Sequence, residues 1–313
     1  MSTELEMETP THEPVLLPEV VSLLREGLAG KERPRILDGT LGLGGYSEAF
    51  LREFPNARVL GLDRDAEALE LAQERLSGCA SGPEPRFRAA RGNFGNLEAV
   101  AEGEKPFDAL AFDLGVSNLQ LTEAARGFSF MRDGPLDMRM DPGGDCPTAA
   151  ELLARLDEGE LARIFRDYGG ERYALRIASR IVAHRKRGGR LETTGELVSL
   201  IRELLPAPVQ RKMGGHPARR VFQALRIAVN NELGELESLL ASLPRVAARG
   251  AAVAVVTYHS LEDRLVKHRF RAWEREEGRG KVLTRHPILP SEEETARNYK
   301  SRSAKLRGFR FLA

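Results

Sequence analysis

A short apolar stretch that runs into a cluster of glycines, residues 35–45, constrains this chain more than any other segment. Its letters, RILDGTLGLGG, predict a β-strand, a glycine-rich turn and the start of a helix. Glycine adopts positive φ and lets a ligand approach the main chain closely. The glycines, Gly39, Gly42, Gly44 and Gly45, lack the GxGxxG spacing of dinucleotide-binding turns. The segment therefore predicts a nucleoside cofactor of another class, with a tight turn that binds nothing as the alternative.

Acidic residues follow the first two predicted strands. Asp38 precedes the glycines, where a carboxylate would repel a pyrophosphate but stabilise a cation. S-adenosylmethionine, which carries an ammonium and a sulfonium, is such a cation. Asp63 lies 19 residues after Gly44, near the spacing at which a carboxylate accepts hydrogen bonds from both ribose hydroxyls. The alternative for Asp63 is a helix N-cap, although Asp65 could cap the helix and leave Asp63 to the ribose.

Short apolar runs alternate with helical patterns over the first 115 residues, which is typical of βαβ units around a mostly parallel sheet. The predicted strands are Arg35–Gly39, Arg58–Asp63, Arg86–Ala90, Asp108–Asp113 and Ala251–Tyr258, with two short strands near Val282 and at Phe309–Leu312. Helices are predicted at Tyr46–Phe54, Ala66–Leu76 and Leu261–Trp273. The chain is therefore expected to have an α/β fold.

About 135 residues separate the fourth and fifth predicted strands, too many for a single crossover. Most of them have helical periodicity, so we expect an all-helical domain, residues 122–232, inserted into a discontinuous sheet domain formed by residues 1–121 and 233–313. The predicted helices of the insertion are Ala149–Leu156, Glu158–Asp167, Arg172–Arg187, Thr194–Leu205 and Pro217–Glu232. The helix predicted next, Leu233–Leu243, is expected to lead back to the sheet.

Two more predicted strands end in segments that suit a binding site. Residues 91–94, RGNF, close the third strand, and residues 113–120, DLGVSNLQ, close the fourth. Ligands of open α/β sheets bind outside the carboxyl ends of the strands, so both segments are expected to lie near the glycine-rich turn. Phe94 could lie against an adenine, with a place in the core as the alternative. Asp113 could contact the cofactor or a target amine.

Residues 126–140 are rich in Gly, Met and charged residues, and long irregular loops are usually functional. We expect this loop to form part of a substrate pocket, with Phe128 or Phe130 stacking on a base. A structured linker to the helical insertion is the alternative.

Lys and Arg number 47 against 46 Asp and Glu, so the net charge of +1 gives no bulk argument for a polyanionic partner. Basic residues are nevertheless dense in three stretches. Residues 163–190 hold nine basic residues and two acids, a second basic stretch covers residues 211–220, and residues 295–313 hold six basic residues and no acid. Phosphate binding depends on such local density. These stretches predict phosphate-binding faces, with ordinary solvated surfaces as the alternative.

The segment TYHSLEDR, residues 257–264, follows the fifth predicted strand. His259 and Ser260 suggest a hydrolase, but the GxSxG turn of such enzymes is absent from it. Ser260, followed three residues later by Asp263, predicts a helix N-cap with an acid at position N3. A pocket wall and a helix cap are therefore expected here rather than a nucleophile.

Several classes of protein are excluded. Cys79 and Cys146 form no CxxC and have no neighbouring His, so neither a disulfide framework nor a metal site is expected. The first 13 residues carry four acids where a signal peptide has basic and then apolar residues. The longest apolar run, Ala251–Val256, is far short of the ~20 residues that span a membrane. We expect a soluble, cytoplasmic protein with no membrane partner.

Taken together, these segments resemble the bacterial family of small-subunit ribosomal RNA methyltransferases called RsmH or MraW, which methylate N4 of a decoding-centre cytosine. The matching segments run almost end to end and are residues 12–16, 38–45, 113–120, 126–140, 215–233, 258–267 and 303–307. The resemblance implies a class I S-adenosylmethionine-dependent methyltransferase fold, which is a Rossmann-like α/β fold with a helical domain inserted after the fourth strand. It also implies 16S rRNA within the small ribosomal subunit as the substrate.

The resemblance further implies the site residues. S-adenosylmethionine would be bound by Gly44, Gly45, Tyr46, Asp63, Phe94, Asp113 and Gln120. Asp113 would orient the amine, and the expected RNA contacts are Arg139, Arg219, Arg220 and His259.

The chain departs from the family pattern at three places. Tyr46 stands where His is usual, Asn118 where a second Ser is usual, and Thr257-Tyr258 where Ser-Phe is common. At Tyr46 a backbone N–H contact would survive the change, whereas a role for an imidazole would not.

The residues by themselves leave two rival classes open. An NAD-dependent dehydrogenase would need a GxGxxG turn, and a non-catalytic RNA-binding protein would keep the basic stretches without needing the cofactor turn. The oligomeric state is also open, with a homodimer as one alternative.

Overall fold

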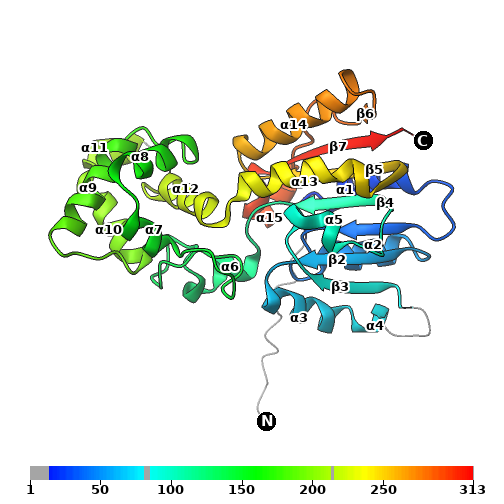
Figure 1. Ribbon diagram of the computed structural model, residues 1–313, viewed down its shortest axis with the longest axis horizontal. Coiled ribbons are helices and arrows are strands. Elements are labelled where there is room, and N and C mark those ends of the chain that lie inside the picture. The colour runs from blue at the N-terminus through cyan, green and yellow to red at the C-terminus, as the bar shows by residue number, and fades with distance from the viewer. Residues whose placement is uncertain (1–13, 81–84, 213–214, 313) are drawn as a thin grey trace, which may run out of the picture. The chain divides into compact units, whose positions relative to one another are not determined.

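The computed structural model describes residues 14–80, 85–212 and 215–312, and the chain divides into two compact units (Figure 1). The sheet unit comprises Met1–Gly115 and Ser238–Ala313, and the helical unit comprises Val116–Glu237. The first boundary between the units, after Gly115, lies six residues before the predicted boundary at 121/122. The second, after Glu237, lies five residues after the predicted boundary at 232/233. The predicted match at His12-Glu13, the acidic N-terminus, and Met213 and Gly214 of the second basic stretch lie outside the described residues.

Among the described residues, seven strands form one sheet in the order β3-β2-β1-β4-β5-β7-β6. They are β1 (Arg35–Asp38), β2 (Arg58–Asp63), β3 (Phe87–Arg91), β4 (Phe107–Asp113), β5 (Ala247–Thr257), β6 (Gly280–Val282) and β7 (Lys305–Phe311). Neighbours from β3 through β5 are parallel, and β7 is antiparallel to both β5 and β6. The predicted, mostly parallel α/β sheet is confirmed.

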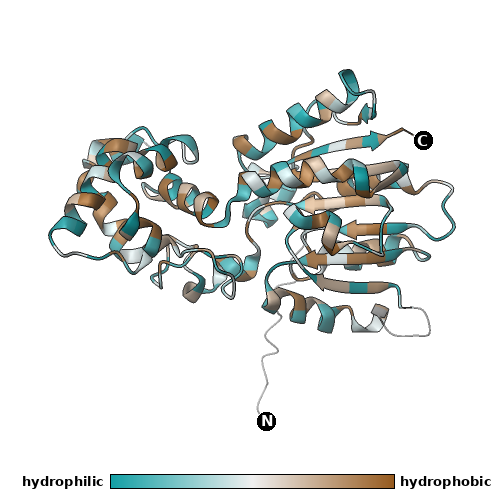
Figure 2. Cartoon of the chain, in the orientation of Figure 1, coloured by the Kyte–Doolittle hydropathy of each residue, from teal (hydrophilic) through white to brown (hydrophobic). Residues whose placement is uncertain are grey.

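The central strands are apolar along their length because both faces of a parallel sheet are covered. In β4, six consecutive residues from Phe107 to Phe112 are buried, and so are eight in β5 from Gly250 to Thr257. Figure 2 shows these strands mostly in the brown of apolar residues. The helix α1 (Leu17–Leu28), which the sequence analysis missed, packs against β4 and β5 through its apolar stripe.

The remaining helices of the sheet unit follow the strands closely. They are α2 (Gly45–Glu53), α3 (Ala66–Arg75), α4 (Ser77–Ala80), α5 (Leu97–Val100), α14 (Ser260–Arg275) and α15 (Glu292–Arg297), with 3₁₀ turns η1 (Phe94–Asn96) and η3 (Tyr299–Ser303). Helix α13 (Glu232–Val246) begins in the helical unit and ends in the sheet unit, directly before β5.

The helical unit contains α6 (Asn118–Thr122), η2 (Ala124–Arg126), α7 (Ala149–Arg155), α8 (Glu158–Asp167), α9 (Ala174–Lys186), α10 (Thr194–Leu204), α11 (Ala207–Lys212) and α12 (Arg219–Asn230). Capping boxes fix where α7, α8 and α10 begin, since each has a Thr or Asp N-cap and a Glu at N3. The helices predicted between residues 149 and 232 are confirmed within two residues, the helix predicted at Leu233–Leu243 ends three residues later than expected, and the short α11 was missed.

A buried polar residue ties the loop of residues 127–148 to α12. The Asn230 side chain accepts a hydrogen bond from Met140 N and donates to the carbonyl of Met138, both at 2.8 Å. The Arg126 guanidinium donates to the carbonyls of Arg139 and Met140. The loop is therefore an ordered part of the helical unit.

No helix within the described residues combines the length and the apolar character that a membrane-spanning segment requires.

Candidate functional site

The candidate site lies where the strand order of the sheet unit reverses. β1 has β2 on one side and β4 on the other, so the connections after β1 and β4 leave in opposite directions. Open α/β sheets bind ligands outside the carboxyl ends of their strands at such a point. The strands β1, β2 and β4 end in Asp38, Asp63 and Asp113 respectively, so three carboxylates stand at this edge.

The turn between β1 and α2 depends on its glycines. A Cβ at Gly39 would lie 2.1 Å from the ring of Phe112 in β4, so only glycine fits there. Gly42 and Gly44 have φ of +50° and +81°, which glycine adopts without strain. A Cβ at Gly42 would meet no atom within 4 Å, so the backbone there faces open space. Gly44 is the N-cap of α2, whose first residue is Gly45.

Asp38 is buried beneath this turn. Its carboxylate accepts a hydrogen bond from Ser47 Oγ at 2.7 Å and one from Thr40 N at 3.4 Å. Burial raises the pKa of Asp38 to about 6, because desolvation disfavours the charged form more than these hydrogen bonds favour it.

Tyr46 uses its side chain inside the sheet unit. Its hydroxyl donates to the carbonyl of Val15, and its ring lies 5.9 Å from that of Phe50. Burial holds the pKa of the Tyr46 phenol well above its usual value. The phenol is thus committed to the core, which leaves the backbone of Tyr46 as the part that could meet a cofactor.

Asp63 links β2 to the glycine-rich turn. Its two carboxylate oxygens accept hydrogen bonds from Gly42 N at 2.8 Å and from Asp65 N at 3.0 Å. Burial raises the pKa of Asp63, opposed by these two hydrogen bonds. Asp65 is the N-cap residue of α3, as the sequence analysis suggested for it.

Asp113, at the end of β4, has the third of these carboxylates. Its N–H donates to Thr40 Oγ1 at 2.6 Å, and its Oδ1 accepts a hydrogen bond from the hydroxyl of Tyr258 at 2.7 Å. Burial raises the pKa of Asp113 to about 7, against the opposing effects of Tyr258 and of the Lys300 ammonium. Burial likewise lowers the pKa of Lys300 to about 8.

Tyr258 and Lys300 were not identified as site residues from the sequence. Tyr258 follows β5, the neighbour of β4, so its position at a strand end was an available signal. Lys300 comes from η3 in the basic C-terminal stretch, and no motif spacing connects it to Asp113.

Phe94 and Gln120 lie in different units. Phe94 begins η1 directly after β3 and is half-buried in the sheet unit. Gln120 is buried in α6 of the helical unit, where it forms a capping box with Ser117. The contact of Gln120 with a cofactor stays a prediction of the family resemblance.

The expected cap of α14 was wrong by one residue. His259, not Ser260, is the N-cap, and its Nδ1 accepts a hydrogen bond from Glu262 N at 3.4 Å. Glu262 is buried, and its carboxylate accepts hydrogen bonds from the backbone N–H groups of Tyr258 and His259. His259 has an imidazole that can accept a hydrogen bond as Ser would, while Glu at N3 completes the box better than the shorter Asp263. Asp263 instead pairs with Arg307 at 2.6 Å.

The three predicted RNA contacts from the helical unit have different surroundings. Arg139 forms a bidentate ion pair with Asp137, with distances of 2.9 and 2.8 Å. Arg219 is exposed at the first turn of α12, whereas Arg220 donates to the carbonyl of Gly170 at 3.1 Å. The fourth predicted contact, His259, lies in the sheet unit with only 9% of its side chain exposed.

The aromatic residues of the 126–140 loop pack against other residues of the helical unit. Phe128 is buried in the core of the helical unit, so its expected role in base stacking is wrong. Phe130 stacks on His216 at 4.7 Å between ring centroids and meets the edge of Phe222.

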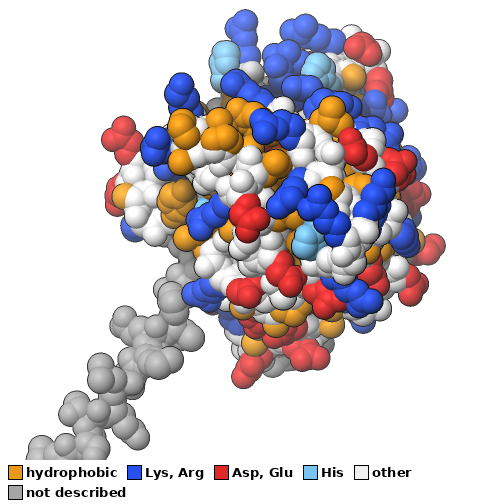
Figure 3. All heavy atoms as spheres, turned by 90° about the vertical axis from the view of Figure 1, so that its left-hand side faces the viewer, with side chains coloured by type: hydrophobic (Ala, Val, Ile, Leu, Met, Phe, Trp, Pro, Cys, Tyr) orange, Lys and Arg blue, Asp and Glu red, His pale blue; other side chains and the backbone are white. Residues whose placement is uncertain are grey.

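The basic stretch of residues 163–190 is only partly available to a ligand. Arg185 donates three hydrogen bonds to the carbonyls at the end of α7, which is a structural role. Arg163, Arg172, Lys186 and Arg187 are exposed. Figure 3 shows many Lys and Arg side chains on the face of the molecule turned to the viewer, with acidic residues between them.

Comparisons with known proteins identify the family of this chain. Residues 9–312 match the family model described as the MraW methylase family. The chain is 44% identical to the "Ribosomal RNA small subunit methyltransferase H" of Maridesulfovibrio salexigens, over 95% of this chain and 94% of that protein. It is also 44% identical to the protein of that name from Heliobacterium modesticaldum, over 95% of this chain and 97% of the other. With nearly the whole length matched and the sheet arranged as described, the chain belongs to the MraW methylase family.

Proposed function

We propose that this protein transfers a methyl group from S-adenosylmethionine to the exocyclic N4 amine of a cytosine in the decoding region of 16S rRNA, in the cytoplasm and within the small ribosomal subunit. The observation that carries the proposal is the set of carboxylates Asp38, Asp63 and Asp113 at the strand-order reversal of a chain that belongs to a methylase family.

The site fits a cationic nucleoside cofactor. Burial raises the pKa of Asp38, Asp63 and Asp113, so each would be stabilised as a carboxylate by a nearby positive charge. The open space over Gly42 leaves room for a ligand against the backbone. Each Asp63 oxygen accepts one backbone hydrogen bond and keeps a lone pair with which to accept from a ribose hydroxyl.

In the proposed arrangement, Gly44, Gly45 and the backbone of Tyr46 lie along the cofactor, and Phe94 lies beside its adenine. S-adenosylmethionine, when bound, supplies an electrophilic methyl group on a positively charged sulfur. The protein supplies orientation and electrostatic stabilisation.

Asp113 is the proposed catalytic residue. Its Oδ1 accepts a hydrogen bond from the Tyr258 hydroxyl, whereas Oδ2 accepts none from the described residues, so Oδ2 is the oxygen with both lone pairs open to an amine. An amine held in this way is better placed to use its lone pair, which is otherwise delocalised into the cytosine ring. Because its pKa is about 7, Asp113 can also accept the proton that N4 loses after methylation. Burial raises this pKa, and Tyr258 and Lys300 are positioning residues that lower it.

For the RNA, the helical unit offers Arg139, Arg219 and Arg220, and the sheet unit offers His259. Phosphate contacts position a nucleic acid, while the reacting base must leave its stack to reach the methyl group. The exposed arginine Arg219 is the strongest phosphate contact of the four, since Arg139 is already paired with Asp137.

The rival classes have less support. Asp38 stands where an NAD-dependent dehydrogenase would place a pyrophosphate, and the turn lacks GxGxxG. A non-catalytic RNA-binding protein would not need three desolvated carboxylates at one sheet edge.

The direct test supplies labelled S-adenosylmethionine with small ribosomal subunits and, separately, with naked 16S rRNA. The modified nucleotide is then mapped by mass spectrometry. We expect one N4-methylated cytosine in the decoding region. No label in either substrate, or label on another atom, would overturn the proposal. Gly44→Asp, which would place a side chain in the turn, should abolish the label, and retained labelling would remove the turn from the site.

A further inference from the structure

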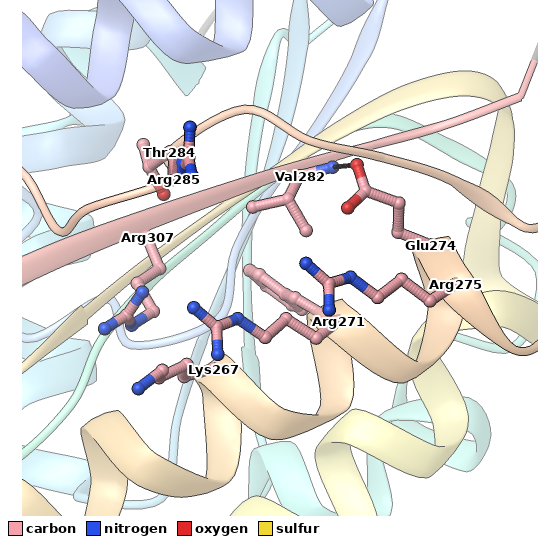
Figure 4. A pocket seen from close by; sticks show the side chains of 9 residues that line it. Lys267, Arg271, Glu274, Arg275, Val282, Thr284, Arg285 and Arg307 are labelled. Carbon is pink, nitrogen blue, oxygen red and sulfur yellow. Dashed lines mark hydrogen bonds between the residues drawn. The ribbon is translucent and has the colours of Figure 1, made fainter.

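A cationic cavity lies in the sheet unit, apart from the residues of the candidate site. It has a volume of about 390 Å³ and is bounded by α14, β7 and the segment after β6. Its lining includes five cations, Lys267, Arg271, Arg275, Arg285 and Arg307, and a single carboxylate, Glu274. Figure 4 shows Lys267, Arg271 and Arg275 projecting from α14 toward the space beneath β7. Such an excess of positive charge around one concave surface favours an anionic ligand.

Most of these cations have no counter-ion within the protein. Arg307 pairs with Asp263, but the side chains of Lys267, Arg271, Arg275 and Arg285 make no hydrogen bond or ion pair with any residue that the structure describes. Glu274 carries a single negative charge against five cations and forms no ion pair with a residue that the structure describes, while its Oε1 accepts a hydrogen bond from Val282 N at 3.0 Å. Four cations are therefore available to a ligand at this cavity.

The spacing on α14 indicates an extended ligand. Lys267, Arg271 and Arg275 recur every four residues, which places them on one helix face about 6 Å apart along the axis. Like charges at this spacing repel one another, and a row of anions would relieve the repulsion. A single small anion would meet one or two of them, whereas a phosphodiester chain can meet all three.

The position of α14 connects this row to the candidate site. Ser260, the first residue of α14, follows the end of β5 after only two residues, Tyr258 and His259. Lys267 and Arg275 lie roughly 10 and 22 Å further along the helix axis. β7 and β6 form the end of the sheet in strand order, so the cavity lies at an edge and not at its centre.

We propose that this cavity, with Lys267, Arg271, Arg275 and Arg285 as its ligand-binding residues, holds backbone phosphates of the RNA substrate at a distance from the base that is methylated. The inference rests on the proposed function in taking RNA as the polyanion. Backbone contacts of this kind add affinity and register without reading sequence.

The test measures binding rather than turnover, with the full-length chain. A fluorescein-labelled transcript of the 16S rRNA decoding region is titrated by fluorescence anisotropy between 50 and 300 mM KCl. The proteins compared are the wild type, the triple variant Lys267→Gln/Arg271→Gln/Arg275→Gln, and a control triple variant, Arg33→Gln/Arg52→Gln/Arg249→Gln. The control removes the same charge from exposed arginines outside the cavity. Calorimetric binding of S-adenosylmethionine to each protein reports whether the fold and the cofactor site are intact.

Loss of three phosphate contacts should reduce the slope of log K against log[KCl] by about 2, since each contact to a single strand contributes about 0.7. The Kd for the transcript should rise at least tenfold in 100 mM KCl, while the control keeps the wild-type slope and all three proteins bind S-adenosylmethionine equally. An unchanged slope in the cavity variant, an equal loss in the control, or no RNA binding by the wild type would each overturn the proposal. Failure of the wild type to methylate small subunits, with the slope changed as expected, would instead overturn the proposed function alone.

Discussion

At the scale of single residues, Asp113 shows how the site sets a protonation state. Burial favours the neutral acid, while the Tyr258 hydroxyl and the Lys300 ammonium favour the carboxylate. The result is a pKa of about 7, so Asp113 changes charge near neutral pH. A group that must accept a hydrogen bond and then a proton is most effective when its pKa lies near the working pH.

This balance predicts a shifted pH profile for Tyr258→Phe. Asp113 is active as the carboxylate, so kcat/KM for S-adenosylmethionine, which reports the pKa values of the enzyme before the cofactor binds, should rise with pH and level off above about 7. Removing the Tyr258 hydroxyl removes an effect that lowers the pKa of Asp113, so the rising limb should move to higher pH. Lys300→Met should move it in the same direction. The measurement is kcat/KM for S-adenosylmethionine between pH 5.5 and 9, with small subunits as the methyl acceptor.

The matched control for Lys300→Met is Arg302→Met, which changes an exposed residue of the same 3₁₀ turn and should leave the profile unmoved. Asp113→Asn should lower kcat by at least about 100-fold and remove the limb. A limb that stays in place in both Tyr258→Phe and Lys300→Met would show that Asp113 does not govern the rate.

A second prediction concerns Asp63. Asp63→Asn loses the charge and one of the two acceptor oxygens that would meet the ribose, so the Kd for S-adenosylmethionine should rise by about 10- to 100-fold. Glu70→Gln, which changes an exposed carboxylate on α3, should leave the Kd unchanged. Isothermal titration calorimetry distinguishes the two. Equal affinity in Asp63→Asn and the wild type would exclude Asp63 from the cofactor site.

At the scale of elements, the turn between β1 and α2 combines two different requirements for glycine. Gly39 is required because Phe112 of β4 fills the space where a side chain would be. Gly42 is required only by its backbone conformation, since nothing lies near its missing Cβ. The turn is therefore both packed against the sheet and open to a ligand.

The two glycines should respond differently to alanine. Gly39→Ala should lower the free energy of unfolding by about 3 kcal/mol, because Phe112 is buried in a strand and has no space to move into. Gly42→Ala should cost only about 1 kcal/mol, from the left-handed backbone. Urea denaturation gives both values. In double variants, Phe112→Leu should restore part of the stability lost in Gly39→Ala and none of the stability lost in Gly42→Ala. Equal restoration in the two double variants would refute the steric explanation.

The elements themselves were largely predictable from the sequence, because their signals are local. Apolar runs predicted β1, β2, β3 and β4 within one residue, and helical periodicity predicted helices such as α10. The amphipathic α1 was missed although Val20, Leu24 and Leu28 lie on one face. The partners of Asp113 were not predictable, because Tyr258 and Lys300 are 145 and 187 residues away and only the folded sheet unit brings them together.

At the scale of the whole molecule, the helical unit is one continuous segment, whereas the sheet unit is assembled from two. The helical unit has its own apolar core, which includes Phe165, Ile177, Ile201 and Leu225. Its loop is fixed internally through Asn230. Each unit thus has the burial that independent stability requires.

This organisation predicts that residues 116–237 fold when expressed alone. The segment should have a helical circular dichroism spectrum and unfold cooperatively with temperature, since its core and caps lie within it. Phe165→Ala, which removes a fully buried ring, should abolish the cooperative transition, while the exposed change Lys186→Ala should preserve it. A wild-type segment without a cooperative transition would refute the independence of the unit.

The pairing of β4 with β5 also bears on the order in which the protein assembles. These neighbours in the sheet end and begin at Asp113 and Ala247, so more than a hundred residues must be bridged before they can pair. For a flexible chain, closing a loop of this length costs about 1.3 kcal/mol more in entropy than closing an ordinary crossover of ~30 residues. The longer loop also slows the pairing of the two strands during folding. If the inserted segment folds first, the span becomes a short connection between fixed ends. The rate at which the catalytic sheet forms would then depend on a core that contains none of its residues.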